Sequence, residues 1–294
     1  MARFSPADAV FAGFRFVKER PGTIMVWAGY LLVAFTVASM AMFDIGGGAI
    51  TAFGLAAQAG HPLNAEQAMK LAQDALPAAL FFTLLMTVFG SVLSAAILRV
   101  RLKPGPHSWA GLRLGGEELR MLAAKFMVLS VVMLAYVVAM LFAAGIESVG
   151  GPAMVGLGVG VGLMLALENG LSLAGVISQT EGRMDPMRSL QLTRLLFWRL
   201  AGAYVLLGAI LLVILVLVQM LFAALLGAAV LAGGGGVAQT VLTVVQGRIT
   251  GLNPVVLAVD VLSILVQVWV AVVATVVFLS IAADAYKAAA DKSV

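Results

Sequence analysis

Six long apolar runs follow one another along this chain, and short polar or basic segments separate them. A run of about 20 apolar residues can cross the ~30 Å hydrocarbon core of a bilayer as one helix. Each of the six runs is long enough for this, so the pattern predicts six membrane spans. The predicted spans cover about 22–43, 75–98, 122–146, 153–177, 200–231 and 255–283.

Shorter segments with a helical alternation of apolar and polar residues precede the first, third and fifth spans. The clearest reads DPMRSLQLTRLLFWRL, where Asp185 suits an N-cap and Pro186 the first helical position. Such amphipathic segments are typical of helices that lie in the headgroup layer. We therefore predict an all-α membrane protein, a single integral domain over 1–294 built of three units. Each unit has two spans and one interfacial helix, at about 6–19, 108–121 and 186–198.

The segment between the first two spans is rich in glycine and then polar, which predicts a long external loop over 44–74. A short surface helix is expected within it, from Asn64 to Asp74. Gly115 and Gly116 weaken the second interfacial helix, since each costs a helix interior about 1 kcal/mol relative to alanine.

Composition supports the same class of protein. Hydrophobic residues make up 62% of the chain and charged residues 11%, against about 25% in soluble domains. The mean hydropathy is +1.08. Cysteine is absent, which excludes disulfides, thiolate catalysis and cysteine metal sites.

Charge predicts the orientation in the membrane. Of the 18 Lys and Arg residues, only Lys70 and Arg248 fall in predicted outer loops, which leaves 16 on the inner side. Inner loops carry this excess in membrane proteins. We therefore expect a multi-pass protein of a bacterial inner membrane, with both termini in the cytoplasm. The net charge of +4 then reflects topology and gives no reason to expect a nucleic-acid partner.

A carboxylate inside a span is costly and is either functional or paired. Glu168 lies about 15 residues into the fourth predicted span, and Gln267 lies at a comparable depth in the sixth. With Asn169 they could form a proton or cation site; the alternative is a structural clamp between helices with Glu168 protonated. Asp260 lies nearer the outer boundary, where water can solvate it.

Two further groups of residues stand out. Small residues recur every four positions along the fourth span and predict a close helix contact, at Gly158, Gly162, Ala166, Gly170 and Ala174. Basic residues on the interfacial helices could bind anionic lipid headgroups or a cytoplasmic or membrane protein partner, although topology alone would also place them there. These residues are Arg15, Lys18, Arg188, Arg194 and Arg199.

The segment from Leu190 to Tyr204, LQLTRLLFWRLAGAY, resembles the membrane domain associated with glycerophosphoryl diester phosphodiesterases and the related YciC-like bacterial membrane proteins. The segment 12–21, AGFRFVKERP, is loosely similar. Leu195 stands where the family often has glycine. The resemblance implies an all-helical six-span domain without catalysis, because the phosphodiesterase activity belongs to a separate soluble domain that we do not expect here.

No catalytic residues, metal site or cofactor can be assigned from the sequence. His61 and His107 fall in predicted loops on opposite sides of the membrane, so they cannot share a metal or a catalytic triad. We expect a non-enzymatic scaffold that binds membrane lipids or a partner. The alternative is a transporter or lipid-handling protein with a polar site at Glu168 and Gln267. The oligomeric state stays open.

Overall fold

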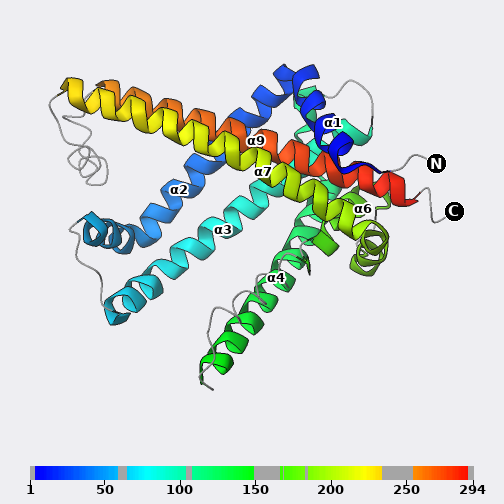
Figure 1. The fold of residues 1–294 in the computed structure, drawn as a ribbon, viewed down its shortest axis with the longest axis horizontal. Helices are drawn as coiled ribbons and strands as arrows, with labels where there is room; N and C mark the ends of the chain where they lie inside the picture. The colour runs from blue at the N-terminus through cyan, green and yellow to red at the C-terminus, as the bar shows by residue number, and fades with distance from the viewer. Residues whose placement is uncertain are drawn as a thin grey trace. The chain divides into compact units, whose positions relative to one another are not determined.

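A computed structural model describes residues 4–58, 65–103, 108–148, 166–167, 169–182, 185–233 and 254–290. Over these ranges the chain is helical and forms no strand (Figure 1). The elements are α1 (Pro6–Glu19), α2 (Pro21–Gln58), α3 (Ala65–Leu102), the 3-10 turn η1 (Ser108–Gly111), α4 (Gly116–Ser148), α6 (Ala174–Thr180), α7 (Pro186–Gly233) and α9 (Pro254–Ala290).

Five of the described helices are long and apolar enough to cross a membrane. The segments that qualify are Pro21–Gly48, Met69–Leu102, Gly116–Val138, Leu196–Leu225 and Val261–Ala290. The fourth predicted span, 153–177, lies largely outside the described residues. The all-α class is confirmed, and five apolar helices fit a multi-pass membrane protein.

Apolar side chains remain exposed along these helices, as expected where lipid is the solvent. In Leu196–Leu225 only 11% of the most apolar stretch is buried by the protein itself. Leu212 and Val213 are examples of its exposed side chains, at 61% and 59% exposure. A water-soluble protein rarely leaves apolar patches of this extent uncovered.

The structure corrects the predicted loop at 44–74, in which the helix expected from Asn64 to Asp74 is present as the start of α3. Helix α2 continues through the glycine-rich stretch to Gln58, and α3 begins at Ala65 and includes Pro77. Glycine and proline weaken a helix interior in water, but a backbone in or beside lipid has few other hydrogen-bond partners. Each helix of 38 residues is about 57 Å long, well beyond a ~30 Å core.

The interfacial helices also differ from their predicted form in two of three cases. The first has its predicted bounds: Ser5 caps α1 by accepting a hydrogen bond from the backbone of Asp8. The second, expected over 108–121, is only the turn η1, after which α4 begins at Gly116. The third, expected over 186–198, runs into the following span without a break as α7.

The described chain packs as two compact units. Unit 1 comprises 1–26, 90–209 and 273–294, and 13 of the chain's 18 Lys and Arg residues lie in its described part. Unit 2 comprises 27–89 and 210–272. In unit 2, the Tyr30 hydroxyl of α2 donates to the Phe89 carbonyl of α3 at 3.1 Å, which joins these two helices.

Candidate functional site

A charged cluster in unit 1 joins the end of α3 to the start of α4; it comprises Arg99, Lys103, Arg113, Glu117 and Glu118. Glu117 contacts three cations, with oxygen to nitrogen distances of 2.9 Å to Arg99, 2.9 Å to Lys103 and 3.0 Å to Arg113. Arg99 also pairs with Glu118, and both of these residues are only 5% exposed. Arg99 is thus the buried centre of the cluster.

The turn η1 helps to position Arg99. Its last residue, Gly111, has φ of +77° and accepts a hydrogen bond from the Arg99 guanidinium through its carbonyl. A Cβ at Gly111 would lie 3.1 Å from the Val100 side chain, so the turn needs glycine for both its backbone conformation and its packing. Gln179 of α6 donates to the Glu117 carbonyl at 2.8 Å and extends the network to a third helix.

Two further ion pairs lie in the same unit. Arg101 of α3 lies 3.2 Å from Asp284 of α9. Arg188 of α7 lies 2.8 Å from Glu181, which also accepts a hydrogen bond from the Tyr286 hydroxyl at 3.0 Å. These contacts join α3 to α9, and the Glu181 segment to α7 and α9, within unit 1. Arg188, one of the predicted lipid contacts, therefore has an internal partner.

The first turns of α7 are held against the chain segment before α6. The hydroxyls of Ser189 and Thr193 both donate to the Gly170 carbonyl, at 3.0 and 3.1 Å. Leu192, Leu196 and Leu200 are buried on the same side of the helix. This anchoring turns the opposite face of α7 outward.

That outward face is the α7 stripe, which consists of Met187, Gln191, Arg194 and Trp198. These residues follow one another at intervals of four, three and four, so they lie on one face of the helix. All four are exposed, Trp198 at 84%. Arg199 is exposed beside the end of the stripe.

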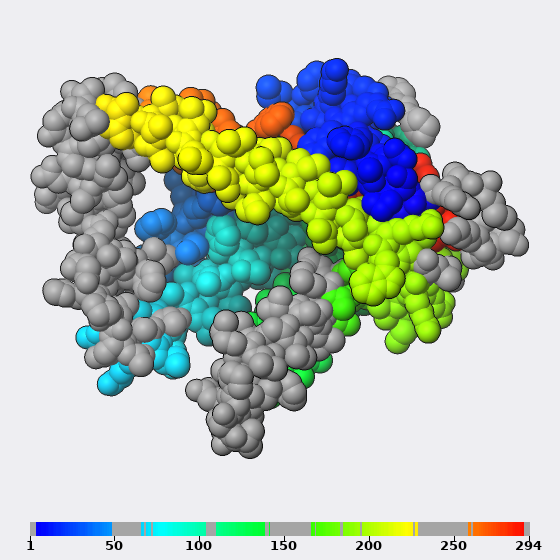
Figure 2. Space-filling view, in the orientation of Figure 1, coloured from blue at the N-terminus to red at the C-terminus, as the bar shows by residue number. Residues whose placement is uncertain are grey.

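Helix α1 is held in a similar way. Its buried residues are Ala9, Val10, Gly13 and Phe16, and a Cβ at Gly13 would lie 2.9 Å from the Val277 Cα of α9. The opposite face is the α1 stripe, which consists of Phe11, Arg15 and Lys18; all three are exposed. Both α1 and the start of α7 are visible on the face of the molecule shown in Figure 2.

The predicted lipid-binding cations thus fall into two groups. Arg188 is paired with Glu181. Arg15, Lys18, Arg194 and Arg199 are exposed, and none of them forms an ion pair with another residue in the described ranges. The four unpaired cations occur with Phe11 and Trp198, so each of the two helices presents positive charge next to an exposed aromatic ring.

The predicted polar site within the membrane is described only in part. Glu168 and the side chain of Asp260 lie outside the described residues. Asn169 is 8% exposed in unit 1, and its amide lies 3.5 Å from the Phe197 carbonyl. Gln267 is exposed in unit 2 and donates to Ser263 of its own helix at 2.9 Å. A site shared by these residues stays a prediction.

The predicted stripe of small residues is likewise described in part. Gly158 and Gly162 lie outside the described residues, and Ala166 is exposed. Gly170 and Ala174 are buried; a Cβ at Gly170 would lie 2.9 Å from the Leu190 side chain. In this described part of the stripe, the lack of a side chain at Gly170 leaves room for Leu190 of α7.

Lys125 of α4 is a residue that we did not single out from the sequence. Its ammonium donates to the Gly90 carbonyl of α3 at 2.8 Å, and Ser94 donates to the same oxygen at 2.7 Å. Lys125 is eight residues beyond Glu117, or about 12 Å along α4, inside a candidate span. The signal was in the sequence: a lone lysine within an apolar run.

Replacing Lys125 by methionine is expected to leave the stability of the protein unchanged or to raise it by up to about 2 kcal/mol. An ammonium at the middle of a span costs ~2.5–3.5 kcal/mol, whereas the lost hydrogen bond is worth ~1 kcal/mol. The thermal unfolding midpoint in lipid nanodiscs measures this. A midpoint several degrees lower would show that the ammonium is needed.

No cluster of His, Cys, Asp and Glu that could hold a metal ion occurs in the part of the chain that the structure describes. Comparison of this chain with protein-family models, with curated proteins and with solved structures finds no match. The family resemblance of the segment 190–204 therefore stays a prediction.

Proposed function

We propose that this chain is a non-enzymatic integral membrane scaffold that binds anionic lipid headgroups through Arg15, Lys18, Arg194 and Arg199. One observation carries the proposal: these four cations are exposed and unpaired within the described ranges, whereas Arg188, on the same helix as Arg194 and Arg199, is paired with Glu181. Packing of α1 and α7 on the rest of unit 1 turns both stripes outward.

The chemistry of the stripes matches a membrane surface. A basic residue near an anionic leaflet gains about 1 kcal/mol from the surface potential. Trp198 and Phe11 add aromatic rings of the kind that favour the boundary between headgroups and acyl chains. A stripe that combines both types of residue binds the lipid phosphate with its cations and inserts its rings just below.

The proposal includes an orientation. The charged cluster of unit 1 and the two stripes lie on the cytoplasmic side of a bacterial inner membrane. Both termini lie on that side as well. The support is the charge distribution, since 13 of the 18 Lys and Arg residues lie in the described part of unit 1 and Lys70 is the one basic residue in the described part of unit 2. The transporter alternative depends on Glu168 and stays a prediction.

Binding of anionic lipid can be measured with the full-length protein in mixed-lipid vesicles. Electron paramagnetic resonance of spin-labelled phosphatidylglycerol and phosphatidylcholine gives their relative association with the protein. Wild-type protein is expected to prefer phosphatidylglycerol about fivefold, which corresponds to ~1 kcal/mol per lipid. The variant with glutamine at all four positions, R15Q/K18Q/R194Q/R199Q, is expected to lose this preference.

A matched control is the double variant K103Q/R113Q. These side chains are similarly exposed, at 58% and 59%, but both are paired with Glu117. The control is expected to keep most of the lipid preference. If wild-type protein shows no preference, or if the fourfold variant keeps it, headgroup binding is overturned; a protein partner for these cations is then the better hypothesis.

A further inference from the structure

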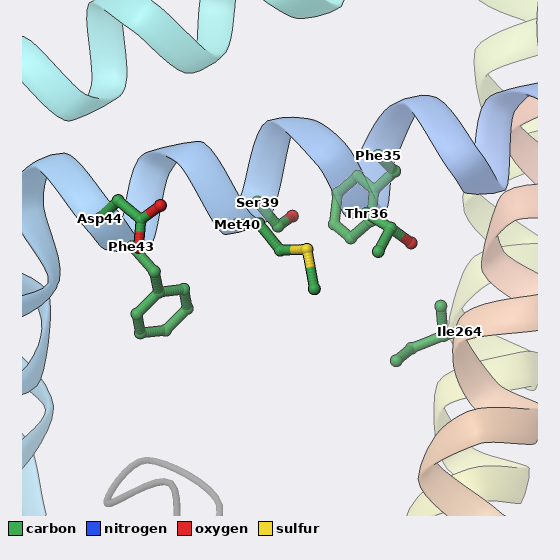
Figure 3. A pocket seen from close by; sticks show the side chains of 7 residues that line it. All are labelled: Phe35, Thr36, Ser39, Met40, Phe43, Asp44 and Ile264. Carbon is green, nitrogen blue, oxygen red and sulfur yellow. The ribbon is translucent and has the colours of Figure 1, made fainter.

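An open groove lies within unit 2, between α2 and α9 (Figure 3). Its volume is about 410 Å³, within the range of pockets that hold small molecules. The α2 side is formed by Phe35, Thr36, Ser39, Met40, Phe43 and Asp44, and Ile264 extends toward it from α9. Unlike the stripes of unit 1, this groove has no basic residue among the described residues that line it.

The lining is mainly apolar; Thr36 and Ser39 are its neutral polar residues, and Asp44 lies at one end. Phe35, Met40, Phe43 and Ile264 are each between 40% and 66% exposed, so the groove offers a large uncovered apolar surface. Thr36 does not make it polar, because its hydroxyl donates to the Leu32 carbonyl of its own helix at 2.9 Å. A flexible hydrocarbon chain suits such a surface.

Asp44 supplies a negative charge at one end of the groove. It is exposed, and it forms no hydrogen bond or ion pair with another residue in the described ranges. It lies four residues, or about 6 Å, from Gly48, where the apolar segment of α2 ends. A carboxylate at this depth reaches the headgroup layer and attracts a positive group there.

The length of the groove corresponds to one leaflet. Phe35 and Asp44 are nine residues apart, or about 14 Å along α2. Half of a ~30 Å hydrocarbon core is ~15 Å. An acyl chain that follows the groove would therefore place its headgroup at Asp44.

We propose that this groove binds a membrane lipid with a primary-amine headgroup, such as phosphatidylethanolamine. One acyl chain lies against Phe35, Met40, Phe43 and Ile264. The ammonium of the headgroup donates to the Asp44 carboxylate. A charge-assisted hydrogen bond of this kind favours a primary amine over the glycerol headgroup of phosphatidylglycerol, which has no cation to offer.

The test uses photoreactive lipids, which report on the groove separately from the stripes of unit 1. Full-length protein in vesicles is irradiated with phosphatidylethanolamine or phosphatidylglycerol that carries the same diazirine-labelled chain, and mass spectrometry locates the labelled residues. Wild-type protein is expected to show about tenfold more labelling of 35–44 by phosphatidylethanolamine, as one charge-assisted hydrogen bond would give. Labelling of α1 and α7 by phosphatidylglycerol tests the scaffold proposal independently.

Three variants separate the two parts of the proposed site. D44N is expected to remove the preference while labelling by both lipids continues, because the apolar groove remains. S39F fills the groove and is expected to lower labelling by both. D74N, which neutralises an exposed acid of α3 outside the groove, is expected to match wild type. Equal labelling of 35–44 by the two lipids in wild type, or an unchanged preference in D44N, would overturn the proposal.

Discussion

Replacing Arg99 by methionine is expected to lower the free energy of unfolding by about 3–5 kcal/mol, as breaking a buried ion pair does. Arg99 and Glu118 are both 5% exposed, and the second carboxylate oxygen of Glu118 already lacks a hydrogen-bond partner within the described residues. Without Arg99 the Glu118 carboxylate loses its cation and stays buried. Chemical unfolding in mixed micelles measures the loss.

Two controls show whether the loss comes from the buried charge. Arg113 is paired with the same Glu117 but is 59% exposed, so R113Q is expected to cost no more than about 1 kcal/mol. The double variant R99M/E118M removes both partners and is expected to recover most of the stability, because it leaves no buried carboxylate uncompensated. If R99M is no less stable than R113Q, the cluster does not stabilise unit 1 as described.

The sequence predicted the existence of the helices better than their ends. Apolar runs locate spans because a helix is the simplest way to satisfy the backbone in lipid. Where a helix stops depends on the partners available to its last amide and carbonyl groups, which local composition does not reveal. The stretch around Gly46, Gly47 and Gly48 would predict a loop in water, yet α2 continues through it to Gln58.

The cations proposed to bind lipid headgroups could be listed from the sequence. Which of them are paired with an acidic residue could not. Arg188, Gln191 and Arg194 are spaced like residues of one helix face, and the sequence alone gave no reason to treat the two arginines differently. The distinction depends on Glu181, which precedes the helix and reaches Arg188 after the turn at Gly182, where φ is +69°. Pairing across a turn of this kind is a tertiary property and leaves no periodic signal.

The same reasoning explains the buried and exposed faces of α1. Helical spacing alone would put Phe4, Ala7, Phe11 and Phe14 on one apolar face, but the structure buries Phe4 and exposes Ala7 and Phe11. The buried face instead consists of Ala9, Val10, Gly13 and Phe16, and at Gly13 the backbone of α9 approaches closely. Hydrophobicity predicted that α1 is amphipathic, and the close approach at Gly13 identifies the face that meets α9.

Replacing Gly13 by valine is therefore expected to destabilise unit 1 by about 1–3 kcal/mol, the usual cost of overpacking. The new Cβ would lie 2.9 Å from the Val277 Cα, a backbone atom that cannot turn away, so α1 would have to move off α9. Thermal unfolding measures the loss, and faster hydrogen exchange in α1 would show that this helix has separated. The lipid preference of the α1 stripe should weaken as well, because its orientation depends on the same contact.

The matched control is Gly202→Val in α7, also within unit 1, where a Cβ would meet no described atom within 4 Å. Valine is slightly better than glycine in a helix, so this variant is expected to equal wild type or to exceed it by a few tenths of a kcal/mol. A change at Gly202 as large as that at Gly13 would point to a general intolerance of valine. Equal stability of both variants and wild type would mean that α1 does not pack on α9 at the distance described. The contrast between the two positions thus tests the contact that turns Phe11, Arg15 and Lys18 outward.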